Sequence, residues 1–204
     1  MILRDLTDGL CTLRLNRPDK ANALTGAMLD SLDAEVVRAT AEGAKALILT
    51  GEGKVFSAGA DLDAAKAGLA TDPVWERLSA RIAGFPGLTI CAMNGTAAGG
   101  ALGMVLACDL RLSVPGANIF YPVMRLGYLP QPSDPGRLAA LVGPARAKMI
   151  LMAGQKIPVE EARDWGLVDR IVPAERLMDE ALALAAGPLA ASGSHVAAIK
   201  GMIG

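Results

Sequence analysis

The sequence predicts an α/β fold in which most strands pair in parallel. Residues 46–50 and 88–93 are short, continuous apolar runs, which is typical of strands covered on both faces. Helical patterns separate these runs, so that strands and helices alternate along the chain. The chain has 204 residues, of which 52% are hydrophobic and only 3% aromatic. That length is sufficient for a single compact domain whose core is built from Ala, Leu, Ile, Val and Met.

The N-terminal elements are predicted to be a hairpin and a helix. Residues 2–6 and 10–15 alternate apolar and polar side chains around Thr7-Asp8-Gly9, which has the composition of a hairpin turn. Residues 16–20 form a turn. Thr25 then precedes a helical pattern that ends at Gly43. The apolar residues expected on one face of this helix are Met28, Leu29, Leu32, Val36 and Val37.

Strands and helices continue to alternate through the middle of the chain. Asp72-Pro73 supplies an N-cap and a first-turn proline for a helix through Ile82. The strand at 88–93 leads through a turn rich in glycine and alanine into a helix at 101–107 and a strand at 109–114.

From Pro144 onward the pattern is mostly helical, with one short strand at 168–172. Helix breaks are expected at Gly154, Gly166, Pro173 and Gly187-Pro188. We therefore expect a sheet-containing core over residues 1–143 and a helical region over residues 144–204.

Composition argues against several functional classes. The 20 Lys+Arg nearly balance the 21 Asp+Glu, and no basic cluster is present, so neither nucleic acid nor an anionic membrane surface is expected as a partner. The apolar stretches are interrupted well short of a bilayer span. No basic segment leads into an apolar run at the N-terminus, so we expect no signal peptide and a cytoplasmic protein.

The cysteines and the single histidine favour structural roles. Cys11, Cys91 and Cys108 are far apart in apolar surroundings, which predicts small buried side chains. One histidine cannot build a His-rich zinc site, and no metal site is expected. His195 is expected in a loop or at a helix start.

Two segments of small residues follow strands and lead into helices, at residues 56–62 and 94–102. Amide groups in the first turn of a helix lack an internal partner, and glycine or alanine lets a ligand approach them closely. Two such N–H groups that converge on one carbonyl oxygen would stabilise the negative charge developing there. The alternative is that these glycines only permit close helix–strand packing, but the presence of both segments favours an oxyanion site.

The sequence resembles the crotonase (enoyl-CoA hydratase/isomerase) family in several motifs that occur in the family's order over most of residues 10–175. They are Asn16-Arg17-Pro18, residues 20–24, residues 56–62, Asn94-Gly95 with residues 98–102, residues 107–111 and residues 160–172. The resemblance implies a crotonase-like spiral of ββα units followed by a helical tail. It also implies an acyl-CoA thioester as substrate, no cofactor beyond its coenzyme A, and assembly as a homotrimer or a dimer of trimers. Relatives usually continue with more C-terminal helices, so a shortened helical tail is expected.

Carried over by position, the resemblance implies that the amides of Ala60 and Gly100 form the oxyanion hole. The adenine and pantetheine arm of coenzyme A would lie along the backbone of four residues, Ser57, Ala58, Asp61 and Leu62. Lys20 and Lys54 are candidate phosphate neighbours, with solvated surface lysines as the alternative. Asp61 has a second interpretation, as the cap of its helix.

The resemblance fails at the two glutamates with which the family's hydratases position and activate water. They are expected at Gly103 and Val123, where neither side chain can transfer a proton. General acid–base catalysis supplies roughly 10² to 10⁴ in rate for each positioned group. Hydration is therefore expected to be very weak.

Other residues of the following loop are candidates to replace these acids. A secondary acid position of the family falls on Gln131, and Asp134 is the only carboxylate of that loop. Asp134 is a candidate acid or base, but a turn or N-cap role before Pro135 is the favoured interpretation. Tyr121 could hydrogen-bond a substrate, or be part of the core or of a trimer contact.

Taken together, we expect a crotonase-fold protein that binds an acyl-CoA and stabilises its enolate through two backbone amides. Isomerase- or decarboxylase-type chemistry is expected in preference to hydration. The alternative is a non-catalytic acyl-CoA-binding or assembly subunit that has kept the fold and lost the acids.

Overall fold

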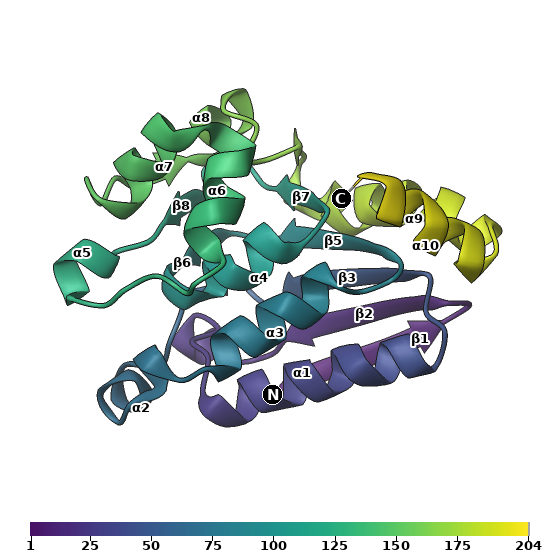
Figure 1. The fold of residues 1–204 in the computed structure, drawn as a ribbon, viewed down its shortest axis with the longest axis horizontal. Helices are drawn as coiled ribbons and strands as arrows, with labels where there is room; N and C mark the ends of the chain where they lie inside the picture. Colours follow the sequence, from purple (N-terminus) through teal and green to yellow (C-terminus); the bar gives the residue numbers. More distant parts are fainter. Residues whose placement is uncertain (204) are drawn as a thin grey trace.

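The computed structural model describes residues 1–203 and contains two mixed sheets flanked by helices (Figure 1). The six-stranded sheet has the order β1-β2-β3-β5-β7-β10, and all of its neighbours pair in parallel except β1 and β2. Its strands are β1 (Ile2–Thr7), β2 (Leu10–Leu15), β3 (Ala46–Gly51), β5 (Leu88–Met93), β7 (Leu110–Ser113) and β10 (Arg170–Ile171). The predicted parallel α/β organisation is thus confirmed.

The second sheet has four short strands in the order β4-β6-β8-β9. They are β4 (Val55–Ser57), β6 (Thr96–Ala98), β8 (Asn118–Phe120) and β9 (Ile157–Pro158). The first three pair in parallel, so their carboxyl ends lie at the same edge. β9 closes the sheet in the antiparallel direction.

The predicted hairpin and first helix are both present. β1 and β2 pair around Asp8 and Gly9, which have φ angles of 52° and 86°. α1 (Gly26–Ala41) starts where the sequence predicts, because the Thr25 hydroxyl accepts a hydrogen bond from the Met28 N–H. The prediction for Val37 is wrong: its side chain is 44% exposed, because it lies at the edge of the apolar stripe.

Helices α1, α3 (Val74–Ala83) and α4 (Leu102–Ala107) pack side by side across the six-stranded sheet (Figure 1). β3 is buried along its whole length, as the unbroken apolar run at 46–50 predicts. The remaining short helices of this part are α2 (Leu62–Lys66) and the 3₁₀ turns Pro18–Lys20, Leu69–Thr71 and Gly99–Ala101.

The C-terminal part is mostly helical, with two short strands, β9 and β10, where the sequence predicts one. Its helices are α5 (Val123–Leu126), α6 (Asp134–Val142), α7 (Pro144–Leu151), α8 (Val159–Asp164), α9 (Leu177–Ala190) and α10 (Gly193–Ile203), with a 3₁₀ turn at Ala174–Arg176. The predicted break at Gly187-Pro188 is wrong, since α9 continues to Ala190. Pro188 lies so close to the helix end that its missing N–H removes only one bond, and the Lys45 ammonium donates to the terminal carbonyls of Leu189 and Ala191.

The core is aliphatic, as the composition predicts. All three cysteines are buried with free thiols, in agreement with their predicted structural role. Within residues 1–203, no single helix is long and apolar enough to cross a bilayer. The segments Ala174–Ala190 and Gly193–Ile203 reach the required length and composition only as a pair, which is bent by 110°.

Candidate functional site

The two small-residue turns predicted from the sequence meet at the edge of the four-stranded sheet. They follow β4 and β6, which are neighbouring parallel strands. A Cβ atom added to Gly59 would lie 2.8 Å from the carbonyl oxygen of Ala98, so only glycine permits this approach. Gly59 and Gly99 also have φ angles of 90° and 57°, a region that favours glycine.

Ala60 and Gly100, one from each turn, line the same cavity of about 230 Å³. Leu24 pairs with both neighbours of the Ala60 amide: its N–H donates to the Gly59 carbonyl (2.8 Å) and its carbonyl accepts from the Asp61 N–H (2.9 Å). Gly100 lies in the first turn of the 3₁₀ helix Gly99–Ala101. Among residues 1–203, neither the Ala60 nor the Gly100 N–H has a backbone carbonyl as partner. Two amides are therefore available at one cavity.

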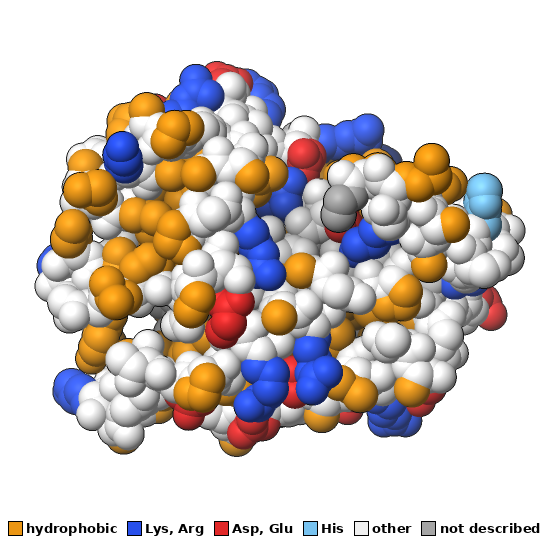
Figure 2. All heavy atoms as spheres, in the orientation of Figure 1, with side chains coloured by type: hydrophobic (Ala, Val, Ile, Leu, Met, Phe, Trp, Pro, Cys, Tyr) orange, Lys and Arg blue, Asp and Glu red, His pale blue; other side chains and the backbone are white. Residues whose placement is uncertain are grey.

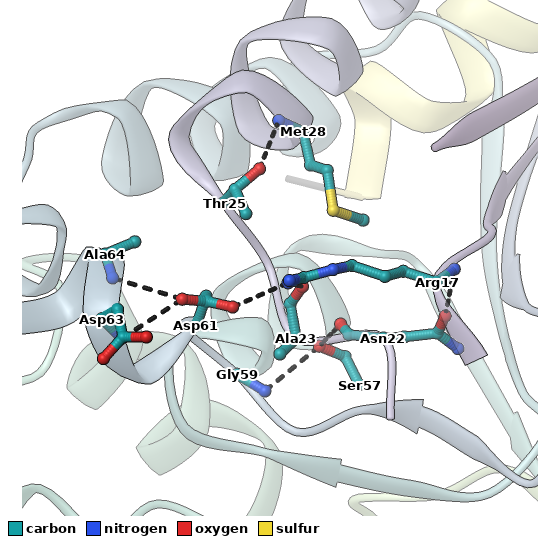
Figure 3. Close-up of polar contacts among 10 residues, drawn as sticks. All are labelled: Arg17, Asn22, Ala23, Thr25, Met28, Ser57, Gly59, Asp61, Asp63 and Ala64. Atoms are coloured by element: carbon teal, nitrogen blue, oxygen red, sulfur yellow. Dashed lines mark hydrogen bonds and ion pairs between the residues drawn. The ribbon is translucent and has the colours of Figure 1, made fainter. Parts of the chain in front are cut away.

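A buried network centred on Asn22 holds the first turn in place (Figure 3). The Asn22 side chain accepts from the Arg17 N–H (2.9 Å) and donates to the carbonyls of Glu52 and Val55 at 2.9 and 2.8 Å. The Ser57 hydroxyl donates to the Asn22 carbonyl (2.8 Å) and accepts from the Gly59 N–H (3.1 Å). The side chain of Ser57 thus lies behind the turn, in a structural role.

An ion pair crosses the outer side of the same turn. The Arg17 guanidinium donates to the Asp61 carboxylate (2.8 Å) and to the Ala23 carbonyl (3.0 Å) (Figure 3). The other Asp61 oxygen accepts from the N–H groups of Asp63 and Ala64, which confirms the interpretation of Asp61 as a helix cap. Hydrogen bonds from Arg17, and then from Ala64, lower the pKa of Asp61.

A second hollow of about 500 Å³ lies on this outer side. Arg17 and Lys20 face it, together with Ala58, Ala60, Asp61 and Leu62. Ala58, Ala60 and Leu62 line both hollows, so the first turn separates them. Lys54, the other candidate phosphate neighbour, lines neither hollow. Asp63 also lines this hollow, and Arg17 is paired with Asp61, so Lys20 is the cation of this lining that forms no ion pair among residues 1–203.

The wall of the inner cavity is mostly apolar. The Trp75 ring packs on Gly100, where an added Cβ would lie 3.1 Å from it, and the indole N–H of Trp75 donates to the Leu69 carbonyl. Large hydrophobic side chains at the mouth are exposed, with Leu62 at 76% and Leu129 at 86%. Figure 2 shows hydrophobic side chains gathered over α5 and the neighbouring helices.

The structure separates the residues at the expected glutamate positions. Val123 and Gln131 both line the cavity, as does Tyr121. Gly103 is buried in α4 and is not part of the cavity wall. An added Cβ at Gly103 would instead lie 3.3 and 3.6 Å from the two carboxylate oxygens of Asp134.

Asp134 is wholly buried beside Tyr121. The Tyr121 hydroxyl donates to Asp134 Oδ2 at 3.0 Å, and Asp134 Oδ1 has no hydrogen-bond partner within the described residues. Burial raises the pKa of Asp134 to about 6, and the Glu76 carboxylate adds to this, while Tyr121 and Arg137 oppose it. Burial, followed by the Asp134 charge, raises the pKa of the Tyr121 hydroxyl.

The interpretation of Asp134 as a cap is wrong. Asp134 is the first residue of α6, after Ser133, and its carboxylate accepts no hydrogen bond from a helical N–H, because its side chain turns inward to Tyr121. The Ser133 N–H and hydroxyl donate instead to Glu76 of α3. Sequence reasoning missed the Asp134–Tyr121 pair because the two residues are joined only by the folding of the loop between them.

His195 lies elsewhere, in the first turn of α10, as predicted for a helix start. It borders a hollow of about 670 Å³ under α10, which contains none of the predicted site residues. Within residues 1–203, no group of three or more His, Cys, Asp or Glu is arranged to hold a metal ion.

Comparisons with known proteins agree on one family. A family model described as "Enoyl-CoA hydratase/isomerase" matches residues 5–203. The chain is 37% identical to "4-chlorobenzoyl coenzyme A dehalogenase-1" from Arthrobacter over 175 residues, which cover 81% of this chain but only 63% of that protein. It is 31% identical to "1,2-epoxyphenylacetyl-CoA isomerase" from Escherichia coli, over 90% of this chain and 74% of the relative.

Solved structures give the same result. The crystal structure of an enoyl-CoA hydratase from Bacillus anthracis matches with a TM-score of 0.92 and 30% identity, over 99% of this chain and 81% of that one. The fold class predicted from the resemblance is therefore confirmed.

Proposed function

The chain belongs to the enoyl-CoA hydratase/isomerase (crotonase) family, whose model matches residues 5–203, and from this premise we propose that it binds an acyl-CoA and polarises the thioester carbonyl with the amides of Ala60 and Gly100. The observation that carries the proposal is that Ala60 and Gly100 line one cavity and that their N–H groups have no backbone partner in the described chain. Preorganised amides stabilise an enolate oxygen because they need no reorganisation when the charge develops.

The outer hollow is the proposed place for the coenzyme A arm, which would follow the backbone of Ser57, Ala58, Asp61 and Leu62. Support comes from Lys20 beside that strip, because its ammonium forms no ion pair among residues 1–203, whereas Arg17 is already paired with Asp61. The acyl group would then enter the apolar inner cavity, whose wall includes Trp75.

The proposed reaction passes through a thioester enolate, as in isomerisation or decarboxylation. Val123 and Gln131 give the cavity wall no carboxylate, and Gly103 gives none either, so activation of water is disfavoured. Loss of carbon dioxide from a β-carboxyl thioester needs stabilisation of the enolate more than it needs a strong base. Both reactions use the same two amides.

We also propose a homotrimer or a dimer of trimers as the assembled form and the cytoplasm as its location. The exposed hydrophobic side chains at the cavity mouth, such as Leu62 and Leu129, support the assembly because a neighbouring subunit would cover them. Light scattering coupled to size-exclusion chromatography gives the mass directly.

A panel of enoyl-, malonyl- and 3-hydroxyacyl-CoA thioesters tests the proposal. Ala60→Pro removes one N–H, and Ala60→Ser keeps it, so the two variants form a matched pair. We expect Ala60→Pro to lower turnover by roughly 10²- to 10³-fold and Ala60→Ser to lower it far less. The carbonyl stretch of a bound, ¹³C-labelled thioester should move to lower frequency in the wild-type protein. Binding without turnover of any thioester would instead support a non-catalytic subunit.

A further inference from the structure

A buried carboxylate lies beside the acyl cavity without being part of its wall. Asp134 is 0% exposed, and its only hydrogen-bond partner among the described side chains is Tyr121, which does line the cavity. The Gln131 N–H approaches the same hydroxyl oxygen at 3.5 Å, a weak contact, and Gln131 is another wall residue. Tyr121, a residue of the cavity wall, is thus in direct hydrogen-bond contact with the buried carboxylate.

The second carboxylate oxygen has no hydrogen-bond partner among residues 1–203. This oxygen, Asp134 Oδ1, is fully buried. A Cβ atom added to Gly103 would lie 3.3 Å from it. A buried, unpaired oxygen of this kind costs free energy, so an aspartate here is not explained by packing alone. The glycine at 103 leaves the space that the carboxylate needs.

We propose that Tyr121 is the catalytic acid–base group of this enzyme and that Asp134 holds the exchanged proton behind it. The proposal rests on the proposed function, because the proton moves to or from the α-carbon of the enolate held by Ala60 and Gly100. In this proposal, one carboxylate, that of Asp134, acts on the substrate through Tyr121. It takes the place of the two glutamates that the resemblance leads one to expect at residues 103 and 123.

The proton transfer is balanced without a free tyrosinate. When the enolate is protonated, the Tyr121 O–H proton moves to the α-carbon while the proton on Asp134 moves to the tyrosine oxygen, which leaves a neutral tyrosine and a carboxylate. Removal of an α-proton follows the same path in reverse, from the carbon to the tyrosine oxygen and from the tyrosine to Asp134. Both steps must be concerted because burial disfavours ionised Tyr121.

The charges around Asp134 allow it to hold or release a proton near neutral pH. Glu76 on α3 opposes ionisation, and Arg137, one turn further along α6, favours it. Arg137 is held by a 2.5 Å hydrogen bond to the Ser79 hydroxyl of α3, and Glu76 accepts from Ser133. α4 (Leu102–Ala107) contains no charged residue, so no charge from that helix faces the carboxylate.

Exchange of the α-hydrogens of butyryl-CoA with heavy water, followed by mass spectrometry, tests the relay between pH 5 and 8. For the wild-type protein we expect the exchange rate to rise with pH and level off above about 6, since abstraction needs the ionised form of Asp134. Asp134→Asn and Tyr121→Phe should each lower the plateau by roughly 10²- to 10⁴-fold, and Asp134→Asn should also remove the inflection. Asp33→Asn is the control, since Asp33 is a mostly buried carboxylate that pairs with Arg77 and Arg81 outside the cavity.

Calorimetric binding of butyryl-CoA separates the two proposals. If the variants bind as the wild type does and exchange at the wild-type rate, the relay is wrong and the proposed function stands. If the wild-type protein binds but does not exchange, the enolate chemistry is wrong and the relay falls with it. The wild-type pH profile needs no folded variant, and a profile without an inflection between pH 5 and 7 overturns the relay.

Discussion

Replacing Asp134 by asparagine should remove one specific pH dependence from the stability of the fold. The side chain is wholly buried, and its ordinary pKa of 3.8 rises to about 6 in the folded protein. Below the unfolded pKa of 3.8, both the folded and the unfolded state hold the proton, so the raised pKa costs the folded state nothing there. As the pH rises through about 6, the unfolded chain gains more from ionisation than the folded one, and this contribution to stability is lost.

The magnitude follows from the size of the shift. A rise from 3.8 to about 6 corresponds to about 3 kcal/mol between the low-pH and high-pH limits, at 1.36 kcal/mol for each unit. About 2 kcal/mol of this falls between pH 4.5 and pH 8, since ionisation of the unfolded chain is well advanced at pH 4.5. Asparagine does not titrate, so the wild type alone loses this stability as the pH rises. The free energy of unfolding of Asp134→Asn, relative to that of the wild type, should therefore rise by about 2 kcal/mol between pH 4.5 and pH 8.

Urea unfolding at matched pH values measures this difference, and the comparison cancels titrations common to both proteins. One such titration is that of Asp61, whose lowered pKa acts in the opposite direction. A constant offset between wild type and Asp134→Asn at every pH would refute the reasoning, because it would mean that Asp134 ionises in the folded protein as it does in water.

The remaining predictions concern the two turns and the expected glutamate positions. Asn22→Ala leaves the Arg17 N–H and two carbonyls without their partner, and it should lower the unfolding free energy by about 2 to 4 kcal/mol, as urea unfolding would measure. Gly59→Ala places a methyl group 2.8 Å from the Ala98 oxygen at a φ of 90°, and thioester turnover should fall more than coenzyme A binding; equal losses in both would contradict this. The double variant Gly103→Glu, Val123→Glu should raise the hydration of crotonyl-CoA, which is followed by absorbance. The gain should increase when Asp134→Asn is added, because a glutamate at residue 103 would otherwise contact the buried Asp134 carboxylate. No gain in either background would mean that the cavity cannot position water.

The sequence predicted the elements whose signals are local. Thr25 has the side chain that caps a helix, and residues 46–50 are apolar at every position, so the start of α1 and the burial of β3 follow from neighbouring residues alone. The two turns were predictable for the same reason, because small residues follow a strand in each. Their contact, Gly59 against Ala98, follows once β4 and β6 are known to be adjacent.

Errors arose where a distant part of the chain changes the local outcome. Pro188 has the local signal of a helix break, but Lys45, far away in sequence, supplies donors to the carbonyls at the end of α9. The Asn22 network is invisible to pattern analysis because its partners lie in residues 52–57. Such contacts depend on the register of strands that the sequence alone does not specify.

Gly103 and Asp134 show the same limit in the candidate site. Taken separately, a glycine predicts a lost acid and an aspartate before a proline predicts a cap. In the folded protein the glycine leaves room for the aspartate, since any Cβ at 103 would lie within 3.6 Å of both carboxylate oxygens. Each residue is therefore understandable only with the other: the missing side chain makes space for a carboxylate from another helix, and that carboxylate reaches the cavity through Tyr121. In the proposed relay, such a site keeps acid–base chemistry beside the enolate even though the positions expected to supply it carry no acid.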